Sequence, residues 1–270
     1  MANNMKIKKI LFLSFFLAVV TVAGLLPGQV VHAASVVINQ TNFPDANFSN
    51  FIKTNYDKNN DWMLSDAELA NVTEMDCSEK SIENLQGIEY FYCLEKLYCN
   101  KNKLTSLDMS YNIALTWLNC DDNKLTFLYV RKNPKLFNLE CDSNQLTSLD
   151  VSQNPKLFCL ACGKNQLTRL DVRKNPELEL LYCGKNQLTG LDVSQNPILR
   201  DLSCYDNQLK SLDVRKNIAL KSLNCNNTQL TNLYVSQNLK LDSLYCNDNQ
   251  LESLDVSKNI DLESLECANT

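Results

Sequence analysis

The sequence contains little of what most catalytic sites require. Among its 270 residues it has one histidine, His32, and only six glycines. We expect this histidine to be lost with the amino-terminal segment described below, which excludes Ser-His-Asp catalysis, Cys-His catalysis and histidine metal ligation. No glycine-rich phosphate-binding loop is present either. We therefore expect that the protein is not an enzyme and requires no cofactor.

Long hydrophobic runs are equally scarce, and the clearest one lies near the amino terminus. Three lysines precede an apolar run over residues 10–26, and small residues follow it at Ala33 and Ala34. This order is typical of a secretory signal peptide, here residues 1–34, with cleavage near Ala33 or Ala34. An uncleaved membrane anchor is the alternative. We expect a secreted protein, extracellular or loosely associated with the cell surface, without an integral membrane segment in the mature chain.

Positive charge is in the minority in the mature chain. Residues 35–270 hold 23 lysines and arginines against 31 aspartates and glutamates, a net charge of −8. Nucleic acids and anionic membranes attract proteins through basic surfaces. The charge balance therefore argues against both as partners.

Cysteine, in contrast, is abundant and strictly periodic. Nine cysteines lie 21 residues apart in the frame Leu-x-x-Leu-x-Cys-x-x-Asn-x-Leu, with threonine replacing the asparagine twice. The frame matches the leucine-rich-repeat template, in which one structural unit is stacked many times. We predict a leucine-rich-repeat solenoid, mostly β, with short parallel strands. The nine are Cys99, Cys120, Cys141, Cys162, Cys183, Cys204, Cys225, Cys246 and Cys267.

Strand geometry assigns a direction to each residue of this frame. Side chains alternate between the two faces of a strand, so Leu97 and Cys99 point into the core and Tyr98 points outward. The back half of each turn repeats the spacing, as in Leu104, Leu107 and Met109, so both sides of the coil should be extended with little helix. Residues 72–93 read as an irregular first repeat, and residues 94–270 as regular repeats of which the last is incomplete.

The cysteine column allows three interpretations. Parallel inward Cβ vectors favour free thiols that pack as small apolar groups. Some disulfides are an alternative, because an exported chain meets oxidising conditions. Metal binding is the third, although zinc sites need ligands clustered in a tetrahedron. Outside the period, Cys159 falls on an outward strand position, where its thiol is expected to be accessible.

A different composition marks residues 35–71, between the signal peptide and the repeats. Phe48, Phe51 and Ile52, and then Leu64 and Leu69, suggest two short helices that cap the open end of the solenoid. The loop between them, residues 57–68, has the spacing of an EF-hand calcium loop. Its sixth position, normally glycine, is Trp62, which would need a positive φ. An acidic turn without metal is the alternative to calcium. The candidate ligands are Asp57, Asn59, Asp61, Met63 and Glu68.

Outward strand positions supply the candidate binding surface. Aromatic side chains are unusually common there, on an otherwise polar sheet. Rigid aromatics beside polar groups are characteristic of protein and carbohydrate recognition, although isolated surface aromatics also occur without function. The candidates are Tyr98, Trp117, Asn119, Leu180, Tyr182, Tyr205 and Tyr245.

The residues over about 40–270 resemble those of bacterial internalin-type surface proteins. The resemblance rests on the motif over residues 42–48, the helical cap, the segment over residues 87–91 and the 21-residue repeat with its cysteine ladder. It implies a curved, right-handed solenoid with a small α-helical cap. It also implies binding, through the concave face, to glycoproteins of host or neighbouring cells, some of them mucin-like.

The predicted function is therefore adhesion or recognition of a protein or glycoprotein outside the cell. The alternative is a structural scaffold, or the recognition arm of a larger protein without a ligand of its own.

Overall fold

The computed structural model describes residues 35–270. The expected signal peptide, residues 1–34, lies outside the described residues. Within the described part, no helix combines the length and apolar character needed to span a bilayer.

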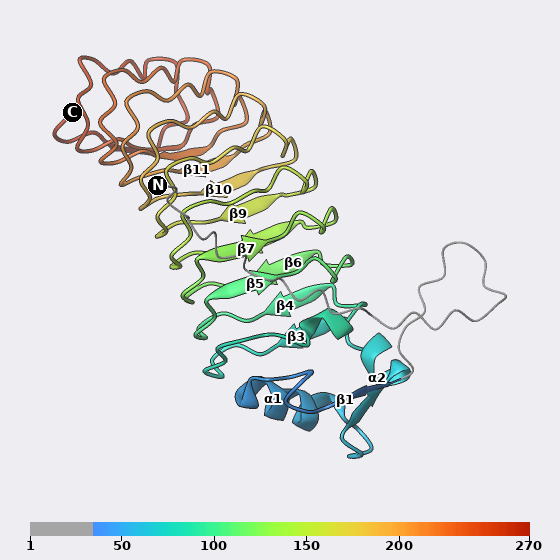
Figure 1. The fold of residues 1–270 in the computed structure, drawn as a ribbon. Helices are drawn as coiled ribbons and strands as arrows, with labels where there is room; N and C mark the ends of the chain where they lie inside the picture. The colour runs from blue at the N-terminus through green and yellow to red at the C-terminus, as the bar shows by residue number, and fades with distance from the viewer. Residues whose placement is uncertain (1–34) are drawn as a thin grey trace, which may run out of the picture. The chain divides into compact units, whose positions relative to one another are not determined.

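The described chain is a parallel-stranded solenoid with few helices, as the repeat frame predicts. Figure 1 shows the strands from β3 onward stacked one upon another, with helices α1 and α2 at the β3 end. Ten strands form one sheet, each pairing in parallel with the strand one turn away. In chain order these strands are β3 (Glu74–Asp76), β4 (Lys96–Tyr98), β6 (Trp117–Asn119), β8 (Asn138–Glu140), β9 (Cys159–Ala161), β10 (Leu180–Tyr182), β11 (Asp201–Ser203), β12 (Ser222–Asn224), β13 (Ser243–Tyr245) and β14 (Ser264–Glu266).

The core is the inward half of this sheet and of the segments behind it. Leu118 at the middle of β6 pairs with Leu139 of β8, and both are fully buried, as are Cys120 and Cys141. A buried leucine contributes roughly 1.5–3 kcal/mol relative to an exposed one. A repeat therefore places the same stabilising groups at the same depth in turn after turn.

An asparagine column closes the strand side of each turn. The Asn165 amide donates to the main-chain oxygens of Cys141, 2.9 Å away, and Cys162, 3.1 Å away. Its side-chain oxygen accepts from the Leu146 N–H at 2.9 Å. The side chain thus satisfies buried main-chain groups of two neighbouring turns.

Thr228 occupies the same column with a shorter side chain. Its hydroxyl reaches the Cys225 oxygen at 2.7 Å and Asn249 Oδ1 at 2.9 Å. Within residues 35–270 the Leu209 N–H, which an asparagine at 228 would bind, has no hydrogen-bond partner. This turn therefore lacks both links that the asparagines make to the preceding turn, the one from the Leu209 N–H and the one to the Cys204 oxygen.

The back side of the coil is held by a second asparagine column and contains less regular strand. Only β5 (Ser106–Asp108) and β7 (Phe127–Tyr129) pair there among the described residues. The Asn175 amide donates to the oxygens of Val151 at 3.0 Å and Asn154 at 2.9 Å. The expectation of an extended back side with little helix holds, but strand pairing on that side is confined to two turns.

The cap contains the two predicted helices and a strand pair that the sequence did not indicate. Helix α1 (Ala46–Tyr56) and helix α2 (Asp66–Ala70) flank the acidic loop. Strand β1 (Ser35–Val37) pairs antiparallel with β2 (Met63–Ser65), which lies inside that loop. A short 3₁₀ helix, η1 (Ile88–Tyr90), leads into the regular repeats.

Asp45 and Phe43 join this cap to the first turns. Asp45 caps α1 by accepting from the Phe48 N–H, and its other oxygen accepts from the Glu83 N–H at 2.7 Å. The buried Phe43 ring lies against Gly87, whose φ is +104° and whose Cα leaves no room for a side chain. Glycine is required at 87 for both reasons.

All twelve cysteines are free thiols, and most of them are fully buried. Desolvation raises the pKa of the thiols from Cys99 to Cys204 well above the ordinary value. Cys159 corrects one expectation. It stands on the outward side of β9, yet it is only 9% exposed, and burial followed by the nearby Glu140 carboxylate raises its pKa to about 12. The predicted accessible thiol is therefore covered and unreactive.

Candidate functional site

The outward residues of the ten-stranded sheet, together with the residue that follows each core cysteine, form a continuous surface that we call the strand face. In leucine-rich repeats such a sheet lines the inner side of the curved solenoid. The opposite surface, formed by the outward residues of the back half of each turn, is called the back face. Each face is a set of columns, because identical positions of successive turns stack in register.

The predicted binding residues fall into two groups on the strand face. Tyr98 and Trp117 come from adjacent strands, with ring centroids 6.5 Å apart, and Asn119 lies two residues farther along β6. Leu180 and Tyr182 lie on β10, and the Tyr182 hydroxyl donates to Asp201 Oδ2 at 3.2 Å. These side chains are half-buried, which holds them in place while leaving part of each accessible.

Tyr205 belongs with the second group for a specific reason. Its ring lies over Gly184 so closely that a Cβ at residue 184 would overlap it. Gly163 stands in the same column one turn earlier, where a Cβ would be 3.2 Å from Asp142 Oδ1. These two glycines allow the tyrosine ring and the aspartate carboxylate to pack against main chain. Tyr245 is separate, and its hydroxyl accepts from Ser264 Oγ at 3.3 Å.

Trp117 carries an unsatisfied donor. Its indole Nε1 is shielded from solvent and has no hydrogen-bond partner among residues 35–270. A buried donor without a partner is uncommon and costs roughly 1–3 kcal/mol.

Sequence reasoning missed an aromatic pair at the edge of the same face. Phe137 and Phe158 stack with centroids 4.8 Å apart and planes inclined by 5°. Phe137 is 44% exposed. Each ring immediately precedes a strand, so the alternation rule for strand side chains did not place it. Equal positions in two consecutive 21-residue turns were the signal available in the sequence.

Sequence reasoning also missed a group of carboxylates at the other end of these strands. Asp121 Oδ1 accepts from the Asp142 N–H at 2.6 Å, and Asp142 Oδ1 accepts from the Gly163 N–H. Glu140 accepts from the side-chain amides of Asn119 at 2.5 Å and Asn138 at 2.6 Å. Burial, and then the Asp142 carboxylate, raise the pKa of Asp121 to about 7. Burial also raises the pKa of Asp142.

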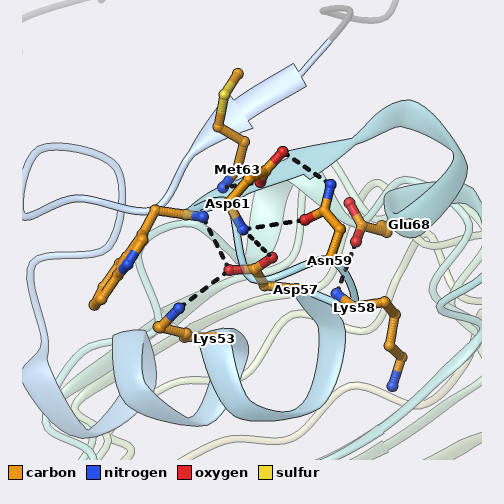
Figure 2. A network of polar contacts seen from close by, with 8 residues as sticks. Lys53, Asp57, Lys58, Asn59, Asp61, Met63 and Glu68 are labelled. Carbon is orange, nitrogen blue, oxygen red and sulfur yellow. Dashed lines mark hydrogen bonds and ion pairs between the residues drawn. The ribbon is translucent and has the colours of Figure 1, made fainter.

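The acidic loop of the cap is arranged differently (Figure 2). The buried Asp57 carboxylate accepts from the N–H groups of Asp61 at 3.2 Å and Trp62 at 3.0 Å. Lys53, one helical turn earlier on α1, places its ammonium 3.4 Å from Asp57 Oδ2 and 3.8 Å from the centroid of the Trp62 ring. Trp62 does adopt the positive φ that this position requires, +64°.

The remaining candidate ligands are also used by protein groups. Glu68 accepts from the N–H groups of Lys58 and Ser65, each at 2.8 Å, as part of the α2 capping box. Asp61 accepts from the Met63 N–H at 2.8 Å and from the Asn59 amide at 2.8 Å. Within residues 35–270 no three acidic, histidine or cysteine side chains are placed to hold a metal. In this arrangement Lys53 and main-chain donors bind oxygens that calcium would use, and calcium binding by the loop stays a prediction.

Known proteins resemble this chain in sequence and in fold. No protein-family model matches the chain. The solved functional domain of InlJ from Listeria monocytogenes, described as including a cysteine ladder, superposes with a TM-score of 0.84 at 39% identity, over 89% of this chain and 54% of that one. The chain is a leucine-rich-repeat solenoid with a cysteine ladder, and it is similar to this internalin domain over most of its own length.

Two further relatives define how far this likeness extends. Internalin J of Listeria monocytogenes serotype 4b (strain F2365) is 41% identical over 70 residues, which are 26% of this chain and 8% of that protein. The leucine-rich-repeat protein LIC12759 of Leptospira interrogans has a TM-score of 0.70 at 24% identity, over 75% of this chain and 57% of that one, which shows a common fold. The chain thus spans about half of the InlJ domain and a small part of the curated relative.

Proposed function

We propose that residues 35–270 form an extracellular recognition module that binds a protein or glycoprotein on the strand face and so supports adhesion to host or neighbouring cells. The observation that carries the proposal is the grouping of half-buried aromatic rings on a rigid sheet. Tyr98 packs with Trp117, and Leu180, Tyr182 and Tyr205 lie on adjacent turns. Rings held by packing lose little conformational freedom on binding, which is why aromatics dominate binding hot spots.

The likeness to InlJ supports the proposal, because it covers most of this chain and includes the cysteine ladder. Residues 35–270 contain no histidine, which argues against catalysis. Their net charge is negative, which argues against nucleic-acid binding. Recognition of a mucin-like glycoprotein is one form of this proposal, and export by the signal peptide is its precondition.

The test is a binding comparison between two pairs of aromatic substitutions. Purified residues 35–270 are applied to arrays of glycans and cell-surface proteins, to immobilised mucin and to cultured cells. Trp117→Ala with Tyr182→Ala should reduce binding at least tenfold. The control is Tyr111→Ala with Tyr234→Ala, which removes two rings that are 68% and 60% exposed on the other side of the coil.

The two pairs also separate the competing interpretations. Equal binding by both double variants would rule out the strand face as the binding surface. Failure of the wild-type module to bind any probe would favour the scaffold alternative. Circular dichroism of both variants checks that each remains folded.

A further inference from the structure

Three carboxylates at the centre of the strand face, Asp121, Glu140 and Asp142, lack the cations that accompany other acidic residues of this chain, such as Glu74 beside Lys96. Eight ion pairs form among residues 35–270, and none includes Asp121, Glu140 or Asp142. Lys164 is the cation that acts on Asp142, without forming an ion pair with it. These three side chains are half-buried, so water screens them less than it screens a fully exposed acid.

Apolar rings lie at the other end of the strand that carries part of this unpaired negative charge. The Phe137 and Phe158 rings stand immediately before strands β8 and β9, whereas Glu140 ends β8 and Asp142 follows it two residues farther along the chain. Three residues separate Phe137 from Glu140, a distance of about 10 Å along an extended strand. The outward residues of β9, Cys159 and Ala161, are small, so the rings and the carboxylates border a low part of the face.

The third feature of this surface is the half-buried Trp117 on the neighbouring strand β6. Its strand partner in the next turn is Asn138, and Asn119 on the same strand binds Glu140.

Resting on the proposed function, we propose that the centre of the strand face binds a polypeptide segment in which a lysine or arginine lies near an apolar side chain. The basic group pairs with Asp121, Glu140 and Asp142. The apolar side chain packs on the Phe137 and Phe158 rings. Charge complementarity selects this occupant, because the carboxylates are desolvated and otherwise unpaired.

Burial and like charge have a measurable consequence for such binding. Because the pKa of Asp121 is raised to about 7, a bound cation must compete with a proton near neutral pH. Binding of a basic segment should therefore weaken as the pH falls below 7 and should release protons.

The experiment uses three fluorescent peptides of equal length as probes against residues 35–270. One alternates lysine or arginine with leucine or phenylalanine, one replaces the basic residues by glutamate, and one replaces the apolar residues by serine. The first should bind at least tenfold more tightly than either of the others. Equal affinity for the glutamate or the serine peptide would overturn the proposal.

Two triple variants, each of which removes three carboxyl groups, locate the interaction. Asp121→Asn with Glu140→Gln and Asp142→Asn should weaken binding of the basic peptide at least tenfold. Asp150→Asn with Asp171→Asn and Asp192→Asn removes three charges from the back face and should change it less than twofold. Equal losses in both variants would indicate general electrostatic attraction and would contradict the proposal. The first variant removes repulsion between buried charges, so we expect it to remain folded.

The outcome is distinguishable from a failure of the proposed function. If Trp117→Ala with Tyr182→Ala abolishes binding to an array ligand while the carboxylate variant binds it normally, the recognition function stands and the basic partner is excluded. Binding of a glycan without basic groups at these carboxylates would also exclude the basic partner.

Discussion

The two faces of the solenoid treat stacked carboxylates in opposite ways. On the back face, Arg173 forms two hydrogen bonds with Asp171, and these bonds lower the pKa of Asp171 to about 2. Arg215 does the same for Asp213. On the strand face, Asp121 has no cationic partner among the described residues, and its pKa is raised to about 7. The same repeat therefore produces a neutralised column on one side and an unpaired one on the other.

This difference teaches that repetition alone does not decide how charge is balanced. Stacked turns bring like charges to roughly 4.8 Å on either face. Arginine alternates with serine along the back face and relieves the repulsion between its aspartates. None of the residues that form the strand face is an arginine. Residues that violate a local structural rule and gain no stability in exchange are commonly functional.

The largest expected effect on stability comes from removing one asparagine from the strand side of the coil and, in a second variant, one from the back side. Asn165→Ala deletes donors to Cys141 and Cys162 and the acceptor for Leu146, and should lower the free energy of unfolding by about 3–4 kcal/mol. Asn175→Ala deletes only donors, because its side-chain oxygen has no partner among residues 35–270, and should cost about 2 kcal/mol. Urea unfolding measures both. Equal costs would contradict the unequal roles of the two columns.

A smaller effect should appear in the pH dependence of stability. The folded-state pKa of Asp121, about 7, exceeds its ordinary value of 3.8, so the folded state retains a proton that the unfolded chain releases between these values. Stability should therefore fall as the pH rises from about 4 to about 7. The facing groups are Asp142, Glu140 and Asp122, all acidic, and none opposes this direction.

The back face contributes with the opposite sign. The pKa values of Asp171 and Asp213 are lowered to about 2, so their stabilising contribution is present above about pH 4 and is lost as the pH falls toward 2. Thermal unfolding across pH should show a maximum near pH 4–5, and Asp121→Asn should flatten its alkaline side. An alkaline slope that survives this substitution would assign the effect to other groups.

The smallest effect concerns the cap loop, where Lys53 pairs with Asp57 much as arginines pair with aspartates on the back face. Lys53→Met should lower stability by about 1 kcal/mol, because Asp57 keeps two main-chain donors, while Lys58→Met serves as an exposed control. Millimolar calcium should leave the melting temperature of the wild type unchanged. A calcium-dependent rise would show that the loop binds the metal after displacing Lys53.

The sequence predicted the elements that depend on periodicity. Leu118, Cys120 and Asn123 are buried because each stands at a position that recurs every 21 residues. The helices followed from the spacing of residues such as Phe48 and Ile52. Strand β1 was missed, because three residues at 35–37 carry too little pattern to reveal a partner at 63–65.

At the candidate site, patterns located the residues but did not show what surrounds them. Cys159 points outward as alternation requires, yet neighbours one turn away cover so small a side chain. The loop spacing suggested calcium, whereas the ammonium of Lys53 reaches Asp57 from the preceding helical turn. The raised pKa of Asp121 depends on burial and on a carboxylate 21 residues away, which no local motif contains.

The buried thiol column has a consequence for how long the protein would last in the extracellular medium that the proposed function requires. While the coil is closed, thiols such as Cys162 are shielded and protonated, and oxidants react with them slowly. An opened coil would expose many thiols at once, and their oxidation would prevent the turns from closing again. The lifetime of the protein in an oxidising medium then depends on the rate at which the coil unfolds. It does not depend on the equilibrium free energy of unfolding.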